Sequence, residues 1–92
     1  MKAAEFRTIF CAEMREHDYL ETWSGGKGPL LQGYKMGRGG CLVLGSHWSV
    51  DLTVAGGKIA VATLSDGKQK RVAIGDDPVA AAREIMAWMG FP

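Results

Sequence analysis

Two cysteines and two histidines are the side chains of this sequence most able to bind a metal. The spacing from Cys11 to His17 repeats from Cys41 to His47. Structural zinc sites place paired ligands closer together than this, on knuckles or on one turn of a helix. A cysteine nucleophile would also need a histidine within reach and a third group to orient it, and nothing local supplies one. We therefore expect two reduced thiols, no metal and no cofactor.

A glycine-rich stretch around Lys27 invites comparison with phosphate-binding loops. A P-loop ends in Gly-Lys followed by serine or threonine, whereas Gly26-Lys27 is followed by Gly28. The carboxylates are scattered, and Asp76 and Asp77 are explained by the start of a helix. The sequence therefore predicts a protein that is not an enzyme.

Basic side chains outnumber acidic ones between residues 23 and 75, although the formal net charge of the chain is only +1. A basic surface favours an acidic partner, and nucleic-acid binding needs clustered lysine and arginine with exposed aromatic rings. Tyr34 and Trp48 are the nearby aromatic residues, and the densest basic run is 68–71. A solvated hairpin is the competing interpretation of that run. The residues that we expect to contact a partner are Lys27, Lys35, Arg38, Lys58, Lys68, Lys70 and Arg71.

A three-stranded antiparallel meander over residues 48–75 is expected to position most of these side chains. Gly56-Gly57 and Asp66-Gly67 both suit two-residue hairpin loops. Counting outward from the two loops gives one consistent register, which pairs Val50 with Thr63 and Val61 with Val72. That register predicts an apolar face made of Trp48, Val50, Leu52, Val54, Ile59, Val61, Val72 and Ile74. The opposite face would carry Asp51, Thr53, Ala55, Lys58, Ala60, Ala62, Arg71 and Ala73.

Helices are predicted before and after the sheet. Residues 3–20 place apolar side chains on one arc, which Glu13 interrupts; alternation within this segment leaves a strand as the competing interpretation, and we favour the helix. At the other end, Asp76 or Asp77 would cap a helix with Pro78 in its first turn, and Gly90 would close it. Its polar stripe would be Ala80, Arg83, Glu84 and Ala87.

The helices must cover the sheet, because a short helix is marginal alone. We expect the C-terminal helix to lie across the Val/Leu/Ile face. Either the N-terminal helix packs on the Ala/Thr face, where small residues permit close approach, or that face stays open and docks a partner.

Residues 21–47 carry weaker signals. Residues 24–29 read as a flexible loop, 29–36 as an edge strand, and Cys41–Leu44 as a short buried strand that forms a hairpin with it. The sheet would then have four or five strands. No apolar run approaches the ~20 residues that span a bilayer, and the first residues lack the apolar segment of a signal peptide. The sequence predicts a single cytoplasmic α+β domain over residues 1–92.

A basic strand runs from Lys68 to Gly75 and is followed by Asp77-Pro78 and by Ala81-Ala82-Arg83. With these features, residues 48–89 resemble the three-strand-plus-helix DNA-binding domains of phage integrases and plant AP2 factors. In those families the sheet reads the major groove, so this resemblance implies direct binding of DNA or RNA by the basic sheet and loops.

The chain also resembles small phage-encoded inhibitors of the anti-CRISPR type. The shared features are its length, a short sheet with tight turns, and the Gly75-Asp76-Asp77-Pro78 start of an alanine-rich helix. This resemblance implies a stoichiometric, non-catalytic protein that binds a host protein or a nucleoprotein complex such as a CRISPR–Cas effector. We take this as the expected function, with direct nucleic-acid binding as the alternative.

Overall fold

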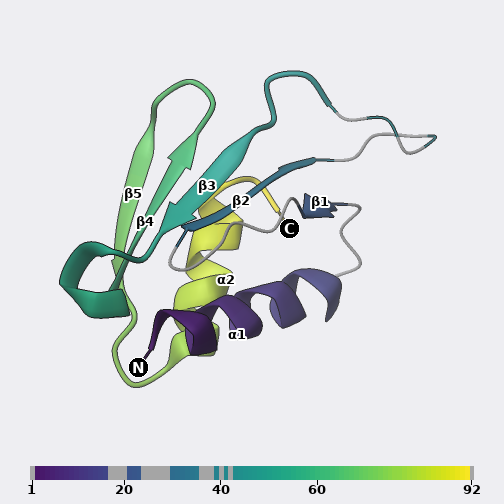
Figure 1. Ribbon diagram of the computed structural model, residues 1–92. Helices are drawn as coiled ribbons and strands as arrows, with labels where there is room; N and C mark the ends of the chain where they lie inside the picture. The colour runs from purple at the N-terminus through teal and green to yellow at the C-terminus, as the bar shows by residue number, and fades with distance from the viewer. Residues whose placement is uncertain are drawn as a thin grey trace.

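The computed structural model describes residues 2–16, 21–23, 30–35, 39, 41 and 43–91. Two helices enclose five strands in the sequence, and the α+β class is confirmed. The elements are α1 (Ala3–Glu16), β1 (Glu21–Trp23), β2 (Leu30–Lys35), β3 (Trp48–Asp51), β4 (Ile59–Leu64), β5 (Gln69–Ala73) and α2 (Pro78–Trp88). The strands pair antiparallel in the order β1-β2-β3-β4-β5. Both helices lie on the same face of the sheet, so the described chain has two layers (Figure 1).

The N-terminal helix forms because its apolar residues recur at helical spacing. Phe6, Phe10 and Met14 are buried against the sheet, and the Phe10 ring packs 5.7 Å from the ring of Trp48, centroid to centroid. The predicted helix is confirmed over residues 3–16, and residues 17–20 lie outside the described part of the chain.

The C-terminal helix begins and ends where its capping residues predict. Asp77 is the N-cap, and its carboxylate accepts a hydrogen bond of 3.0 Å from the backbone nitrogen of Ala80. Gly90, with φ of 92°, ends the helix in a Schellman arrangement, in which the Phe91 nitrogen donates to the Met86 carbonyl. The predicted exposed stripe is confirmed at all four positions: Ala80, Arg83, Glu84 and Ala87.

The three-strand meander is confirmed, but its hairpin loops are longer than predicted. The nitrogen of Leu64 donates to the Lys68 carbonyl, and the nitrogen of Gly67 donates to the Leu64 carbonyl. The loop therefore has three residues, 65–67, and Gly67 takes the left-handed conformation with φ of 89° that such loops require. The first loop also differs: residues Val54–Gly57 form a 3-10 turn instead of a two-residue hairpin at Gly56-Gly57.

These longer loops shift β4 by one residue against both neighbours, so the predicted register is wrong. Val50 pairs with Ala62, and Val61 pairs with Arg71. Since a one-residue shift turns a strand over, Ala60 and Ala62 face the helices and are fully buried. β3 and β5 keep the faces predicted for them, because the two shifts cancel between these strands.

α2 lies on the Val/Leu/Ile face of β3 and β5 as predicted, whereas the alternative that α1 packs on the opposite face is wrong. α1 and α2 share the face that carries Trp48, Val50, Ala60, Ala62 and Val72, and the small alanines of β4 let both helices approach. The opposite face carries Ile59, Val61 and Thr63 of β4, which are half-buried. No helix of the described residues covers that face (Figure 1).

The segment before β3 departs most from prediction. β2 forms as expected, but it is an inner strand between β1 and β3 rather than an edge. Cys41, Val43 and Leu44 are not in a strand, and all three are exposed, so the predicted buried strand and its hairpin with β2 are wrong. Among the described residues, no helix is both long enough and apolar enough to cross a membrane.

Candidate partner-binding surfaces

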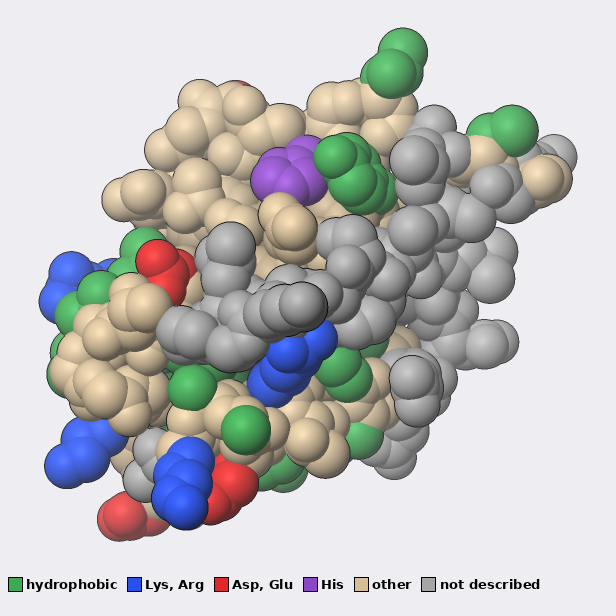
Figure 2. Space-filling view, in the orientation of Figure 1, with side chains coloured by type: hydrophobic (Ala, Val, Ile, Leu, Met, Phe, Trp, Pro, Cys, Tyr) green, Lys and Arg blue, Asp and Glu red, His purple; other side chains and the backbone are tan. Residues whose placement is uncertain are grey.

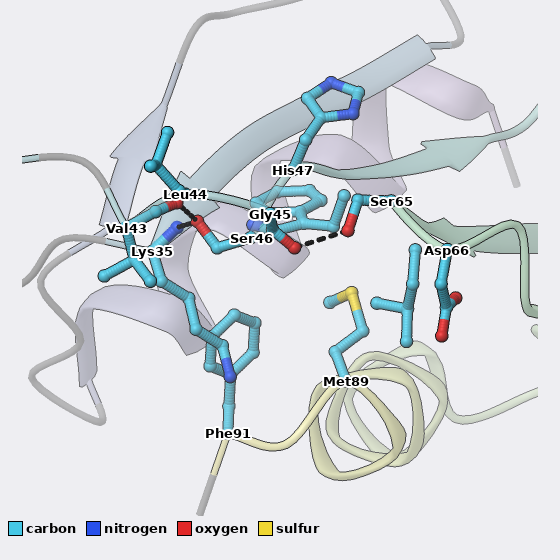
Figure 3. A pocket seen from close by; sticks show the side chains of 12 residues that line it. Lys35, Val43, Leu44, Gly45, Ser46, His47, Ser65, Asp66, Met89 and Phe91 are labelled. Atoms are coloured by element: carbon cyan, nitrogen blue, oxygen red, sulfur yellow. Dashed lines mark hydrogen bonds between the residues drawn. The ribbon is translucent and has the colours of Figure 1, made fainter.

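A hollow of about 390 Å³ lies where three separate segments meet (Figure 3). Residues 43–47, which enter β3, form one wall, and the loop between β4 and β5 forms another. The segment after α2 closes the third side. We call this hollow the groove, and its lining includes Val43, Leu44, His47, Asp66, Met89 and Phe91.

Hydrogen bonds hold the walls of the groove in place. Ser46 Oγ accepts from the backbone nitrogen of Lys35 at 3.0 Å and donates to the Val43 carbonyl at 2.5 Å. The Val43 nitrogen donates to the Lys35 carbonyl at 2.9 Å. Ser65 Oγ donates to the Gly45 carbonyl, which ties this loop to the β4–β5 hairpin. The wall is therefore anchored at three points although it has no regular structure.

The floor of the groove is apolar and its rim carries exposed aliphatic side chains. Trp48, Met89 and Phe91 are each at most 5% exposed. By contrast, Leu44 is 98% exposed and Val43 is 42% exposed, and among the residues whose burial is described these are the large hydrophobic side chains that face water. Two adjacent exposed aliphatic residues beside a concave apolar floor are typical of a contact surface.

The seven basic residues predicted to contact a partner do not form one patch among the described residues. Lys27 and Arg38 lie outside the described chain. Lys35 is half-buried; its Nζ lies 4.7 Å from the centroid of the Phe91 ring and beside Gly90, where it faces the C-terminal end of α2. Lys58 is exposed before β4, at the strand end opposite Lys68. Figure 2 shows Lys and Arg side chains at separate places on one face of the molecule.

The β4–β5 hairpin does bring three of the predicted residues together. Lys68 is exposed, with its Nζ 3.8 Å from the Asp66 carboxylate. Lys70 and Arg71 follow on β5 and point to opposite faces of the sheet, because successive strand residues alternate. Arg71 lies on the open face, and Lys70 lies on the helix side.

The open face of the sheet also carries an aromatic pair that sequence reasoning missed. The rings of Tyr34 and His47 lie 4.9 Å apart, centroid to centroid. Nearby on the same face, Gln69 Nε2 lies 3.5 Å from Thr63 Oγ1. Trp48, the other aromatic residue expected to stack on a ligand, is instead buried in the core.

At the far end of β3, the Asp51 carboxylate accepts two hydrogen bonds from Thr53. Its Oδ1 accepts hydrogen bonds from the backbone nitrogen of Thr53 at 2.9 Å and from the Thr53 hydroxyl at 2.7 Å. These bonds favour the ionised form and lower the pKa of Asp51. The arrangement orders the chain as it leaves the strand and needs no ligand to explain it.

The remaining chemistry is limited in the part of the chain that the structure describes. Cys11 is half-buried on α1 and Cys41 is exposed, and His17 lies outside the described residues. No three His, Cys, Asp or Glu side chains among the described residues lie close enough together to hold a metal ion. Comparison of the chain with protein families, with curated proteins and with solved structures found no match.

Proposed function

We propose that this chain is a non-catalytic binding protein that contacts a partner protein through the groove. The observation that carries the proposal is the position of Leu44, which is almost fully exposed beside an apolar floor. Burying one leucine side chain contributes about 1.5–3 kcal/mol. A folded chain that leaves this side chain in water next to Val43 gains that free energy only when a partner covers both.

The rigidity of the groove supports the same function. Interface residues contribute most when they are held in place before binding, since less side-chain and loop entropy is then lost. The three backbone anchors at Lys35, Val43 and Gly45 hold the rim in this way. The basic residues of the β4–β5 hairpin follow directly after the groove wall, and they favour a partner with acidic groups near the groove.

The finer proposal is that the partner is a host nucleoprotein complex, such as a CRISPR–Cas effector, and that binding inhibits it. Its support is the resemblance to small phage-encoded inhibitors and the combination of an apolar anchor with a neighbouring basic hairpin. A nucleoprotein complex offers both an apolar protein surface and many anionic groups.

The test compares three forms of the immobilised protein in a host lysate. The parent chain should enrich a defined set of Cas or other nucleoprotein components. Leu44→Asp should lose that set, while Val61→Asp, which makes the same kind of change on the open sheet face, should retain it. Equal capture by the Leu44→Asp variant would reject the groove as the contact surface. If the parent enriches no nucleoprotein component, the finer proposal fails.

Direct binding of DNA or RNA is the second candidate. It is favoured by the open sheet face, where Arg71 and Gln69 share a surface with the Tyr34–His47 pair. Phosphate contacts make such binding steeply dependent on salt. A gel shift with single- and double-stranded DNA at about 50 mM and 200 mM salt separates the two functions. Binding that weakens steeply at the higher salt supports this candidate, and the absence of any shift at the lower salt rejects it.

A further inference from the structure

A second interaction surface lies at one edge of the sheet, on the side of β5 that faces away from β4. β5 is the last strand in the sheet order, and none of the described residues pairs with its outer edge. In Figure 1 this edge faces away from β4 along its whole length. We infer that it accepts an extended, acidic segment of a partner protein as an added strand. This surface is separate from the groove of the proposed function.

The hydrogen-bond pattern identifies the backbone groups available to such a strand. The nitrogen of Ile74 donates to the Lys58 carbonyl, and the carbonyl of Lys68 accepts from Leu64. Residues of an antiparallel strand alternate between facing one neighbour and facing the other. The backbone N–H and C=O groups of residues 68, 70, 72 and 74 therefore point toward β4. The N–H and C=O groups that point to the free edge belong to Gln69, Arg71 and Ala73, whose side chains are exposed.

A hollow beside the edge leaves room for the side chains of an added strand. It has a volume of about 730 Å³ and lies between the end of β5 and one side of α2. Its lining includes Ala73, Ile74, Val79, Ala80, Arg83 and Glu84. Because alanine side chains are small, they leave space beside α2. Every second side chain of an added strand can pack there, and the others lie on the open face.

Charge selects the occupant. Lys70 lies on the helix side and Arg71 on the open face, both near the hairpin-loop end of β5. Both faces of an added strand therefore meet a cation there. A second copy of β5 would bring like charges together, which disfavours edge-to-edge pairing of this protein with itself. Glu84 and Asp77 lie by the hollow, so the acidic residues of the partner segment align with Lys70 and Arg71 and its apolar residues with Ala73.

The test uses a short capped peptide in which two adjacent glutamates, which point to opposite faces of an added strand, are followed by threonine and valine. The control peptide has lysines in place of the glutamates. Strand addition predicts that the glutamate peptide slows hydrogen exchange at the Gln69, Arg71 and Ala73 amides by about tenfold or more. The Lys70 and Val72 amides, already bonded to β4, should change little. Charge attraction without strand pairing would not produce this alternation.

Three variants complete the experiment. Arg71→Glu should weaken binding of the glutamate peptide by about fivefold, while Lys58→Glu, the same charge change on the neighbouring strand side and not at the edge, should have a smaller effect. Ala73→Pro removes one edge N–H without changing any charge, and it should also weaken binding. Proline is tolerated where the N–H faces away from the sheet; if this variant does not fold, the exchange pattern and Arg71→Glu still decide. Leu44→Asp should bind the peptide as the parent does, which separates this edge from the groove.

The inference is overturned if the glutamate peptide does not bind, if the lysine peptide binds equally well, or if binding leaves the three edge amides unprotected. Protection of the same amides in concentrated protein without peptide would also overturn it, since the occupant would then be a second copy of the chain.

Discussion

Arg83 of α2 donates from its Nε to Glu13 Oε2 of α1 at 2.8 Å, and this contact joins residues that are 70 positions apart. Glu13 interrupts the apolar arc of its helix, and it is only 7% exposed. The contact places a counter-charge beside a carboxylate that the packing of α1 against α2 removes from water.

Removing this counter-charge should destabilise the protein. Arg83→Met keeps most of the aliphatic stem but leaves the buried Glu13 without its guanidinium, at an expected cost of about 1–3 kcal/mol. Half-exposure of the Arg83 side chain keeps the value below that of a fully buried pair. Urea unfolding measures the change, and Glu84→Met on the same helix is the control. Equal midpoints for the two variants would contradict the role of the pair.

The register of β4 can be checked with two neighbouring substitutions. Ala62→Asp places a carboxylate under both helices and should prevent folding, because an unpaired buried charge costs several kcal/mol, comparable with the stability of a small domain. Val61→Asp lies on the open face and should leave a folded protein with a moderately lower melting temperature. Circular dichroism on heating distinguishes the variants. If Val61→Asp were the more damaging substitution, the observed register would be contradicted and the register predicted from two-residue hairpins would be supported.

Two adjacent glycines in the β3–β4 connection should respond differently to the same substitution. Both Gly56 and Gly57 have positive φ, at 64° and 89°, so alanine at either position costs about 1 kcal/mol in backbone strain. A Cβ at Gly57 would also lie 3.0 Å from the backbone nitrogen of Ala3, whereas nothing lies within 4 Å at Gly56. Gly57→Ala should therefore lower the unfolding midpoint clearly more than Gly56→Ala. Equal effects would show that α1 does not begin against this turn.

The hydrogen bonds of Asp51 should make one part of the stability depend on pH. Its pKa is lowered in the folded state, so the stabilisation is present above about pH 4 and is lost as the pH falls through the folded pKa. Asp51→Asn should destabilise the protein at neutral pH, and the difference from the parent should shrink at acidic pH. Urea midpoints measured on both proteins between about pH 6 and pH 2.5 test this. A constant difference across that range would contradict it.

Helix ends and strand positions could be read from the sequence because they depend on local signals. Asp77, Pro78 and Gly90 define α2 whatever surrounds it, and alternation marks the strands of the meander. The faces of β4 could not be read in the same way. Both Asp66-Gly67 and Gly56-Gly57 suit two-residue loops, but each is part of a longer turn, and Ile59 and Val61 look more like core residues than Ala60 and Ala62. Packing of two helices on one face decides the outcome.

The candidate surfaces were less predictable than the fold. Charge alone selected the expected contact residues, and charge does not show that Lys35 faces the end of α2 or that Lys70 and Arg71 lie on opposite faces. The apolar pair Val43–Leu44 led to the prediction of a buried strand, but a short apolar run is equally compatible with an exposed contact segment. The folded structure shows that both side chains are exposed and that hydrogen bonds from Val43, Ser46 and Ser65 fix the backbone of this segment.

The pairing of α1 with α2 has a consequence for how the chain folds during synthesis. The apolar side of α1 packs with residues of α2, which are synthesised after all five strands, so the core cannot close while the sheet is emerging. Contacts of such long sequence separation slow folding, and exposed apolar surface in the interval favours aggregation. The β4–β5 hairpin, whose contacts are local, is the element best placed to form early.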